Sequence, residues 1–277
     1  MAFPWLKGHG TENDFVLLPD ADGSLHGALE PEFVAALCHR RRGIGADGVL
    51  RVIRANSLRA IDASIPVTDA EWFMDYRNAD GSTSEMCGNG IRVFARYLIE
   101  AGLADNPITI GTRAGDRVVA ANGDGTYSAT MGSADIRGTS KVRANGRAWE
   151  AQDIRMGNPH AVAFVEDLAD AGSLTEAPEH DPEVYPEGVN VEFVVRQAAG
   201  HLAMRVHERG SGETRSCGTG ACAAAVAAMI ADGAERPDSY VVEVPGGTLG
   251  VTWQADGELV LSGPAEIVAS GELEWLN

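Results

Sequence analysis

Two segments of the chain have the apolar pattern of helices, and each begins directly after a Cys-Gly-x-Gly sequence. In residues 87–102, apolar residues recur every three or four positions, at Ile91, Phe94, Leu98 and Ala101. This spacing predicts a helix that packs on a sheet by one face. Residues 217–233 contain almost only Ala, Val, Met and Ile after the glycines, which predicts a helix enclosed on all sides.

Short alternating or β-branched runs dominate the rest of the chain and are typical of strands. They predict strands over residues 72–76, 117–120, 126–131, 189–195, 202–206 and 240–244. Because there are many strands for each helix, the pattern indicates an α+β fold.

The order of the predicted elements occurs twice along the chain. An Asn opens an apolar run before each helix, at Asn13 and at Asn158. An extended run with a small-residue turn follows each helix, at residues 108–115 and 242–247, and each half closes with a strand that ends near Gly132 or Gly263. We interpret this order as an internal duplication.

The duplication predicts two pseudo-symmetric domains, each a β-sheet wrapped around a central helix, with the active site in the interdomain cleft. The N-terminal half covers residues 1–132, contains the helix after Cys87 and is completed by residues 264–277. The C-terminal half covers residues 133–263 and contains the helix after Cys217.

Composition narrows the class of protein. The chain has 277 residues, of which 44% are apolar and 22% charged, as in ordinary globular proteins. No stretch approaches the ~20 apolar residues that span a bilayer, and no export signal is present, so we expect a cytoplasmic protein. The net charge of −18 disfavours nucleic acid or an anionic membrane as a partner.

The cysteines at the two helix starts are candidate acid and base groups. A sulfur there faces the first-turn amides and the positive end of the helix dipole, which favour the thiolate and lower the pKa of the thiol. The amides of Gly88, Asn89, Gly218 and Thr219 could bind a carboxylate. Two such sulfurs on opposite sides of one α-carbon could invert it, one removing a proton and the other delivering one.

A single Cys-Gly would more simply be a small buried residue at a tight turn, and it is the matched pair that favours function. The remaining cysteines, Cys38 and Cys222, lie in apolar helical segments and are expected to pack in the core. The cysteine spacings lack the paired C-x₂-C units of structural zinc, so no metal site is predicted.

Polar residues recur at matching distances from the two cysteines. Asn78 and Glu208 each precede their cysteine by nine residues, so they should converge on one site. Glu208 suits an ammonium group and Arg209 suits a carboxylate, although an adjacent Glu-Arg pair is often only a surface feature. Further candidates for binding polar groups are Asn13, Asn158 and Asn190, and His160 could tune the pKa of a nearby thiol.

At these residues the chain resembles the diaminopimelate epimerase family over nearly its whole length. The motifs that carry the resemblance lie at residues 13–15, 43–47, 78–81, 85–92, 156–160, 188–190 and 208–220. The resemblance implies interconversion of LL- and meso-diaminopimelate without pyridoxal phosphate or metal, for lysine and peptidoglycan synthesis, by a homodimer.

The resemblance also implies roles for single residues. Cys87 and Cys217 would be the two bases, tuned by His160 and Glu208, and Glu208 would also meet the α-ammonium group. The amides around Gly88-Asn89 and Gly218-Thr219 would take the α-carboxylate. The distal end of the substrate would be held by Asn13, Asn78, Asn158, Asn190 and Arg209.

Two positions depart from the family pattern. Residues 9–12 read His-Gly-Thr-Glu where many members have Gly-Leu-Gly, so the approach to the distal pocket is expected to differ. Position 48 is Gly where many relatives place a Gln that contacts substrate, so that contact is expected to be missing or replaced.

Three other functions remain as alternatives. A proline racemase or hydroxyproline epimerase would share the fold but would not need the distal set of Asn residues with Arg209. A thiol-disulfide redox protein would normally carry a C-x-x-C signature, which is absent. A non-catalytic binding module would keep the glycines but need not keep both thiols.

Overall fold

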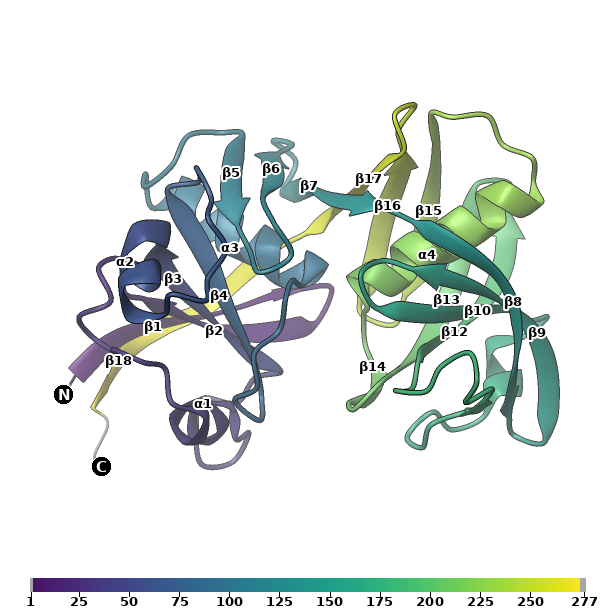
Figure 1. Ribbon diagram of the computed structural model, residues 1–277, viewed down its shortest axis with the longest axis horizontal. Helices are drawn as coiled ribbons and strands as arrows, with labels where there is room; N and C mark the ends of the chain where they lie inside the picture. The colour runs from purple at the N-terminus through teal and green to yellow at the C-terminus, as the bar shows by residue number, and fades with distance from the viewer. Residues whose placement is uncertain (1, 275–277) are drawn as a thin grey trace. The chain divides into compact units, whose positions relative to one another are not determined.

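The computed structural model describes residues 2–274, which divide into two compact units. The first unit comprises residues 2–129 together with 264–274, and the second comprises residues 130–263. The chain passes from one unit to the other twice, within β7 (Thr126–Ser133) and at the end of β17 (Glu258–Pro264) (Figure 1).

The first unit is a mixed sheet with three helices. Its helices are α1 (Pro31–Cys38), α2 (Ala55–Ile61) and α3 (Gly88–Glu100). Its strands, in spatial order before β7, are β18 (Glu266–Glu274), β1 (Ala2–Gly10), β2 (Asn13–Pro19), β3 (Gly48–Arg54), β4 (Trp72–Asn78), β5 (Ile108–Gly111) and β6 (Arg117–Ala121). The pairs β2–β3 and β4–β5 are parallel, and the other neighbours are antiparallel.

The second unit has the same arrangement around α4 (Gly218–Ala231). Its strands in spatial order before β17 are β8 (Asp135–Ala144), β9 (Arg147–Arg155), β10 (Pro159–Phe164), β12 (Asn190–Ala198), β13 (His201–Glu208), β15 (Asp238–Val244) and β16 (Gly247–Trp253). The pairs β10–β12 and β13–β15 are parallel and the other neighbours are antiparallel, so the order of pair types is the same as in the first unit. The second unit also contains three short elements that the described part of the first unit lacks: β11 (Glu179–His180), β14 (Gly212–Thr214) and the 3₁₀ helix η1 (Leu168–Ala171).

Each unit places one long helix against the inner face of its sheet (Figure 1). On α3, the side chains of Ile91, Phe94 and Leu98 are fully buried in a cluster with residues of β2, β3 and β4. The prediction that Ala101 continues this stripe is wrong, because the helix ends there and Ala101 is exposed. On α4, residues 220–229 are buried on every side, as predicted.

The small side chains of α4 allow its backbone to lie close to the surrounding strands, and Cys222 is one of them. Cys222 is fully buried, and Cys38 at the end of α1 is buried as well, so both pack in the core as expected. Within residues 2–274, no helix combines the length and apolar character needed to cross a membrane.

Candidate active site

Each predicted reactive cysteine caps the start of its unit's long helix. Cys87 and Cys217 both have extended backbone angles, with φ of −138° and −122°. Their sulfurs accept hydrogen bonds from the amides of Gly90, at 3.4 Å, and Gly220, at 3.3 Å. The cysteine sulfur therefore takes the place that a Ser or Asp oxygen takes at an ordinary helix start, facing the first-turn amides.

The glycines after each cysteine permit close packing under the helix start. A Cβ on Gly90 would lie 3.2 Å from Leu50, and one on Gly220 would lie 2.6 Å from a carboxylate oxygen of Glu192. A side chain at position 220 would displace the Glu192 carboxylate, and one at position 90 would require a small shift of Leu50, so both glycines allow close packing beside the sulfur.

In the first unit, Asn13 links the sulfur of Cys87 to two polar side chains. The thiol of Cys87 donates to Asn13 Oδ1 at 3.6 Å, and Asn89 Nδ2 donates to the same oxygen at 3.2 Å. Asn13 Nδ2 in turn donates to Asp47 Oδ2 at 2.8 Å. The structure thus brings together three of the predicted residues, Asn13, Cys87 and Asn89, and adds Asp47.

A buried guanidinium fixes the orientation of Asn89. Arg92 is fully buried near the start of α3, and it donates to Asn89 Oδ1 and to the carbonyl of Gly88, both at 3.1 Å. Because Asn89 Oδ1 accepts from Arg92, its Nδ2 faces Asn13. Sequence reasoning missed Arg92, although an Arg five residues into an apolar helix was a visible signal.

Asn78 lies at the end of β4, opposite Gly48 at the start of β3. Since Phe15 of β2 pairs with Gly48 on its other side, Asn13 and Asn78 lie at the same end of the sheet. The Asn78 side chain donates to Ser82 Oγ at 3.0 Å. A Cβ on Gly48 would lie 2.5 Å from Arg77 O and 2.7 Å from the Tyr76 ring, so this sheet leaves no space for a longer residue at position 48.

In the second unit, the Cys217 side chain is buried among polar neighbours. Thr219 Oγ1 lies 3.5 Å from the Cys217 sulfur, and Asn158 Nδ2 donates to Thr219 Oγ1 at 3.4 Å. Asn158 Oδ1 lies 3.0 Å from Nε2 of His160. These four predicted residues therefore form one continuous chain of hydrogen bonds.

His160 continues this chain to Glu192, a residue that sequence reasoning did not select. His160 Nδ1 lies 2.7 Å from Glu192 Oε1, and both side chains are fully buried. A Glu within the otherwise apolar run 191–194 was the available signal. A charged side chain with no exposure must have a specific partner, and here that partner is His160.

Glu208 is the last residue of β13, and Arg209 follows it. Glu208 accepts a hydrogen bond from Thr214, and burial raises the pKa of the Glu208 carboxyl. The amide of Arg209 donates to Asn190 Oδ1 at 2.8 Å, whereas the Arg209 guanidinium is half-exposed and points to Glu187. The structure thus places Asn190 against the backbone of Arg209.

The surroundings of Cys217 correct the expectation that its helix start lowers the pKa of its thiol. Burial raises the pKa of Cys217 well above its usual value, and the carboxylates of Glu208 and Glu192 add to this effect. Hydrogen bonds from Thr219 and from the amide of Gly220 act in the opposite direction and are outweighed. The resting form of this sulfur is therefore the protonated thiol.

The predicted site residues are divided between the two units and are grouped by the unit in which they lie. The first group contains Asn13, Asn78, Cys87, Gly88 and Asn89. The second group contains Asn158, His160, Asn190, Glu208, Arg209, Cys217, Gly218 and Thr219.

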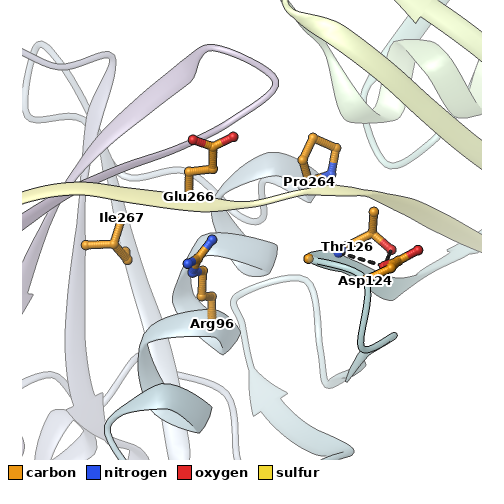
Figure 2. A pocket seen from close by; sticks show the side chains of 7 residues that line it. Arg96, Asp124, Thr126, Pro264, Glu266 and Ile267 are labelled. Atoms are coloured by element: carbon orange, nitrogen blue, oxygen red, sulfur yellow. Dashed lines mark hydrogen bonds between the residues drawn. The ribbon is translucent and has the colours of Figure 1, made fainter.

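The first unit also contains a pocket. It is lined by residues that include Arg96, Asp124 and Glu266 and by none of the predicted residues (Figure 2). Between residues 2 and 274, no cluster of three or more His, Cys, Asp or Glu side chains is arranged to hold a metal ion.

The architecture occurs in solved isomerase structures of low sequence identity. A hydroxyproline epimerase from Agrobacterium vitis superposes with a TM-score of 0.69 at 16% identity, covering 98% of this chain and 92% of that one. The chain thus has the two-domain fold of the proline racemase, PhzF and diaminopimelate epimerase-like proteins.

Sequence comparison shows to which family with this fold the chain belongs. It belongs to the diaminopimelate epimerase family, whose model matches residues 5–136 and 153–268. It is 54% identical to the diaminopimelate epimerase of Streptomyces coelicolor, over 99% of this chain and 96% of that protein. It is 47% identical to that of Rhodococcus jostii, over 98% of both. The chain is therefore an enzyme of the isomerase class.

Proposed function

We propose that this protein interconverts LL- and meso-diaminopimelate by a two-base mechanism in which Cys87 and Cys217 exchange the roles of base and acid. The observation that carries the proposal is that both units present a cysteine sulfur at the same place, as the cap of a long helix with the amide of the third helical residue pointing at it. Family membership supports the choice of substrate.

In the reaction, one cysteine as thiolate removes the α-proton and becomes a thiol. The electron pair of the broken C–H bond moves into the α-carboxylate, where amides at the helix starts stabilise the developing charge. The other cysteine, as thiol, donates its proton to the opposite face of the α-carbon and becomes a thiolate. The proton count is unchanged, and the two cysteines have exchanged protonation states.

The remaining polar residues are assigned to substrate recognition. In this proposal Glu208 meets the α-ammonium group, and Gly88, Asn89, Gly218 and Thr219 supply the carboxylate site. The distal amino-acid end is held by Asn13, Asn78, Asn158, Asn190 and Arg209. The proposal further places the enzyme as a cytoplasmic homodimer in lysine and peptidoglycan precursor synthesis, with no cofactor.

The mechanism is tested by replacing each sulfur separately. Cys87→Ser and Cys217→Ser should each abolish epimerisation of LL-diaminopimelate, because serine is too weak an acid to act in either role. Cys38→Ser and Cys222→Ser, at buried thiols outside both groups, are the matched controls and should retain turnover if they fold. Near-normal turnover by Cys87→Ser or Cys217→Ser would exclude the two-base mechanism.

The substrate is tested by incubating the enzyme with LL-diaminopimelate or with proline in deuterated water. Exchange of the α-proton of diaminopimelate alone is expected, since proline has no distal amino-acid end for the Asn residues and Arg209 to hold. Exchange of proline would favour the racemase alternative instead.

A further inference from the structure

The side chains that pack beneath the start of the long helix are apolar in the first unit and ionisable in the second. In the first unit, Phe15 pairs with Gly48, the first residue of β3. Leu50 lies two residues further along that strand and packs against Gly90. In the second unit, His160 pairs with Asn190, the first residue of β12. Glu192 lies two residues further along that strand and packs against Gly220. Phe15 therefore corresponds to His160, and Leu50 to Glu192.

The buried His160–Glu192 pair is not required by the fold. Phe15 and Leu50 fill the corresponding positions of the first unit with hydrocarbon and are fully buried, as are His160 and Glu192. Burial of ionisable side chains costs desolvation free energy, and apolar residues of similar volume are often as stable or more so. A polar pair at two positions where the first unit is apolar therefore indicates a role beyond packing.

The hydrogen bonds show what the pair can do. A carboxylate only accepts, so His160 Nδ1 carries the proton in its 2.7 Å contact with Glu192. His160 Nε2 then faces Asn158 Oδ1 at 3.0 Å, and Asn158 Nδ2 donates to Thr219 beside Cys217. Both ring nitrogens of His160 thus have an oxygen partner, so the ring is held in one orientation between Glu192 and Asn158.

The second carboxylate oxygen of Glu192 adds an independent observation. Glu192 Oε2 is buried and has no hydrogen-bond partner among residues 2–274. The groups that interact electrostatically with this carboxylate include His160 from β10, Glu208 from β13 and Cys217 at the start of α4. Glu192 therefore contacts His160 through one oxygen and lies close enough to Cys217 for its carboxylate to act on the sulfur.

We propose that Glu192 is a positioning residue of the second half-site, which holds His160 with Nδ1 protonated and, through His160 and Asn158, holds Thr219 against the Cys217 thiol. This inference rests on the proposed two-thiol function for its catalytic consequence, but the orientation of His160 can be measured without substrate.

The test uses the full chain with Glu192→Leu, which copies the first unit, and Glu192→Gln, which keeps an acceptor oxygen without charge. Glu243→Gln is the control, because Glu243 forms a 2.8 Å pair with His201 on the surface of the same unit. Nitrogen-15 NMR of histidine-labelled protein, with His160 assigned from a His160→Gln sample, reports the protonation of each ring nitrogen.

We expect the hydrogen-bonded Nδ1 proton of His160 to be lost in Glu192→Leu and kept in Glu192→Gln and Glu243→Gln. The kcat/KM should fall about 10²-fold in Glu192→Leu, as for a supporting group displaced by about 1 Å. The kcat/KM should fall about tenfold in Glu192→Gln, where a charge-assisted hydrogen bond becomes neutral. The pH profile of kcat/KM should also shift in this variant. The control should match the wild type in both measurements.

A double variant separates positioning from packing. His160→Phe/Glu192→Leu recreates the apolar layer of the first unit, so its denaturation midpoint should equal or exceed that of the wild type while kcat/KM remains low. An unchanged His160 spectrum in Glu192→Leu, or unchanged kcat/KM in both Glu192 variants, would overturn the proposal. Activity of Cys217→Ser would instead refute the two-thiol mechanism and leave the NMR result standing.

Discussion

Asn13 presents its amide oxygen to the sulfur of Cys87, 3.6 Å away, and accepts a hydrogen bond from the thiol. The amide cannot turn over without loss, because its nitrogen donates to Asp47 at 2.8 Å. Asp47 therefore determines which atom of Asn13 the cysteine meets, although Asp47 itself does not contact the sulfur.

Asp47→Ala should lower kcat/KM about tenfold, the effect of losing one charge-assisted hydrogen bond that orients a binding group. Steady-state kinetics with LL-diaminopimelate measure the loss, and Asp124→Ala, at an exposed turn of the same unit, is the control. Equal kcat/KM in the two variants would show that the orientation of Asn13 does not depend on Asp47.

The protonation of Cys217 in the free enzyme gives a second prediction. Because burial and then the carboxylates of Glu208 and Glu192 raise the pKa of Cys217, its alkylation by iodoacetamide should still accelerate with pH where a peptide thiol of pKa about 8.5 has levelled off. Glu208→Gln should move this rise to lower pH. Mass spectrometry of the peptide that carries Cys217 measures the rate.

The same pKa shift affects stability. The protonated thiol is favoured in the folded protein, so its contribution is complete below about pH 8.5 and decreases as the pH rises and the unfolded thiol ionises first. Cys217→Ser should remove this part of the alkaline loss of stability. A Cys217 that is alkylated at or below the pH range of a peptide thiol would contradict both predictions.

Gly48 gives a third prediction, because a Cβ at this position would clash with the Arg77 carbonyl and the Tyr76 ring. Gly48→Gln should reduce the free energy of unfolding by about 1–3 kcal/mol through overpacking. Urea denaturation measures the change. Gly250→Ala, whose Cβ would be 3.6 Å from its nearest neighbour, should be nearly neutral, and a neutral Gly48→Gln would show that β3 and β4 can separate.

The pair Arg51–Asp20 gives a fourth prediction. The carboxylate of Asp20 accepts from Arg51 at 2.5 Å, and the two side chains are 0% and 1% exposed. Asp20→Ala should cost about 3–5 kcal/mol of unfolding free energy, because it leaves a buried guanidinium without its charge partner. Glu71→Ala, which breaks an exposed pair with Arg54, should cost no more than about 1 kcal/mol.

Much of the fold was predictable because its signals are local. The Cys-Gly-x-Gly sequences mark both helix starts, and periodicity identifies α3 and α4 and several strands to within a few residues. Strand order depends on pairings between distant segments, such as β13 with β15, and no local pattern specifies these.

The candidate site was less predictable where it depends on burial. Glu192 lies in a correctly predicted strand, but only the packing of α4 on β12 reveals that its carboxylate faces Gly220. The pKa of Cys217 was predicted in the wrong direction for the same reason. A helix start is visible in sequence, whereas the loss of water around the sulfur and the two nearby carboxylates are tertiary effects.

The edge strand β18 has a consequence for synthesis on the ribosome. This strand pairs with β1 along residues 2–9, yet it is translated only after the whole second unit. The second unit is continuous in sequence, whereas β1 has one edge unpaired until β18 has been translated. The unit that is translated first therefore depends on the segment that is translated last to complete its sheet.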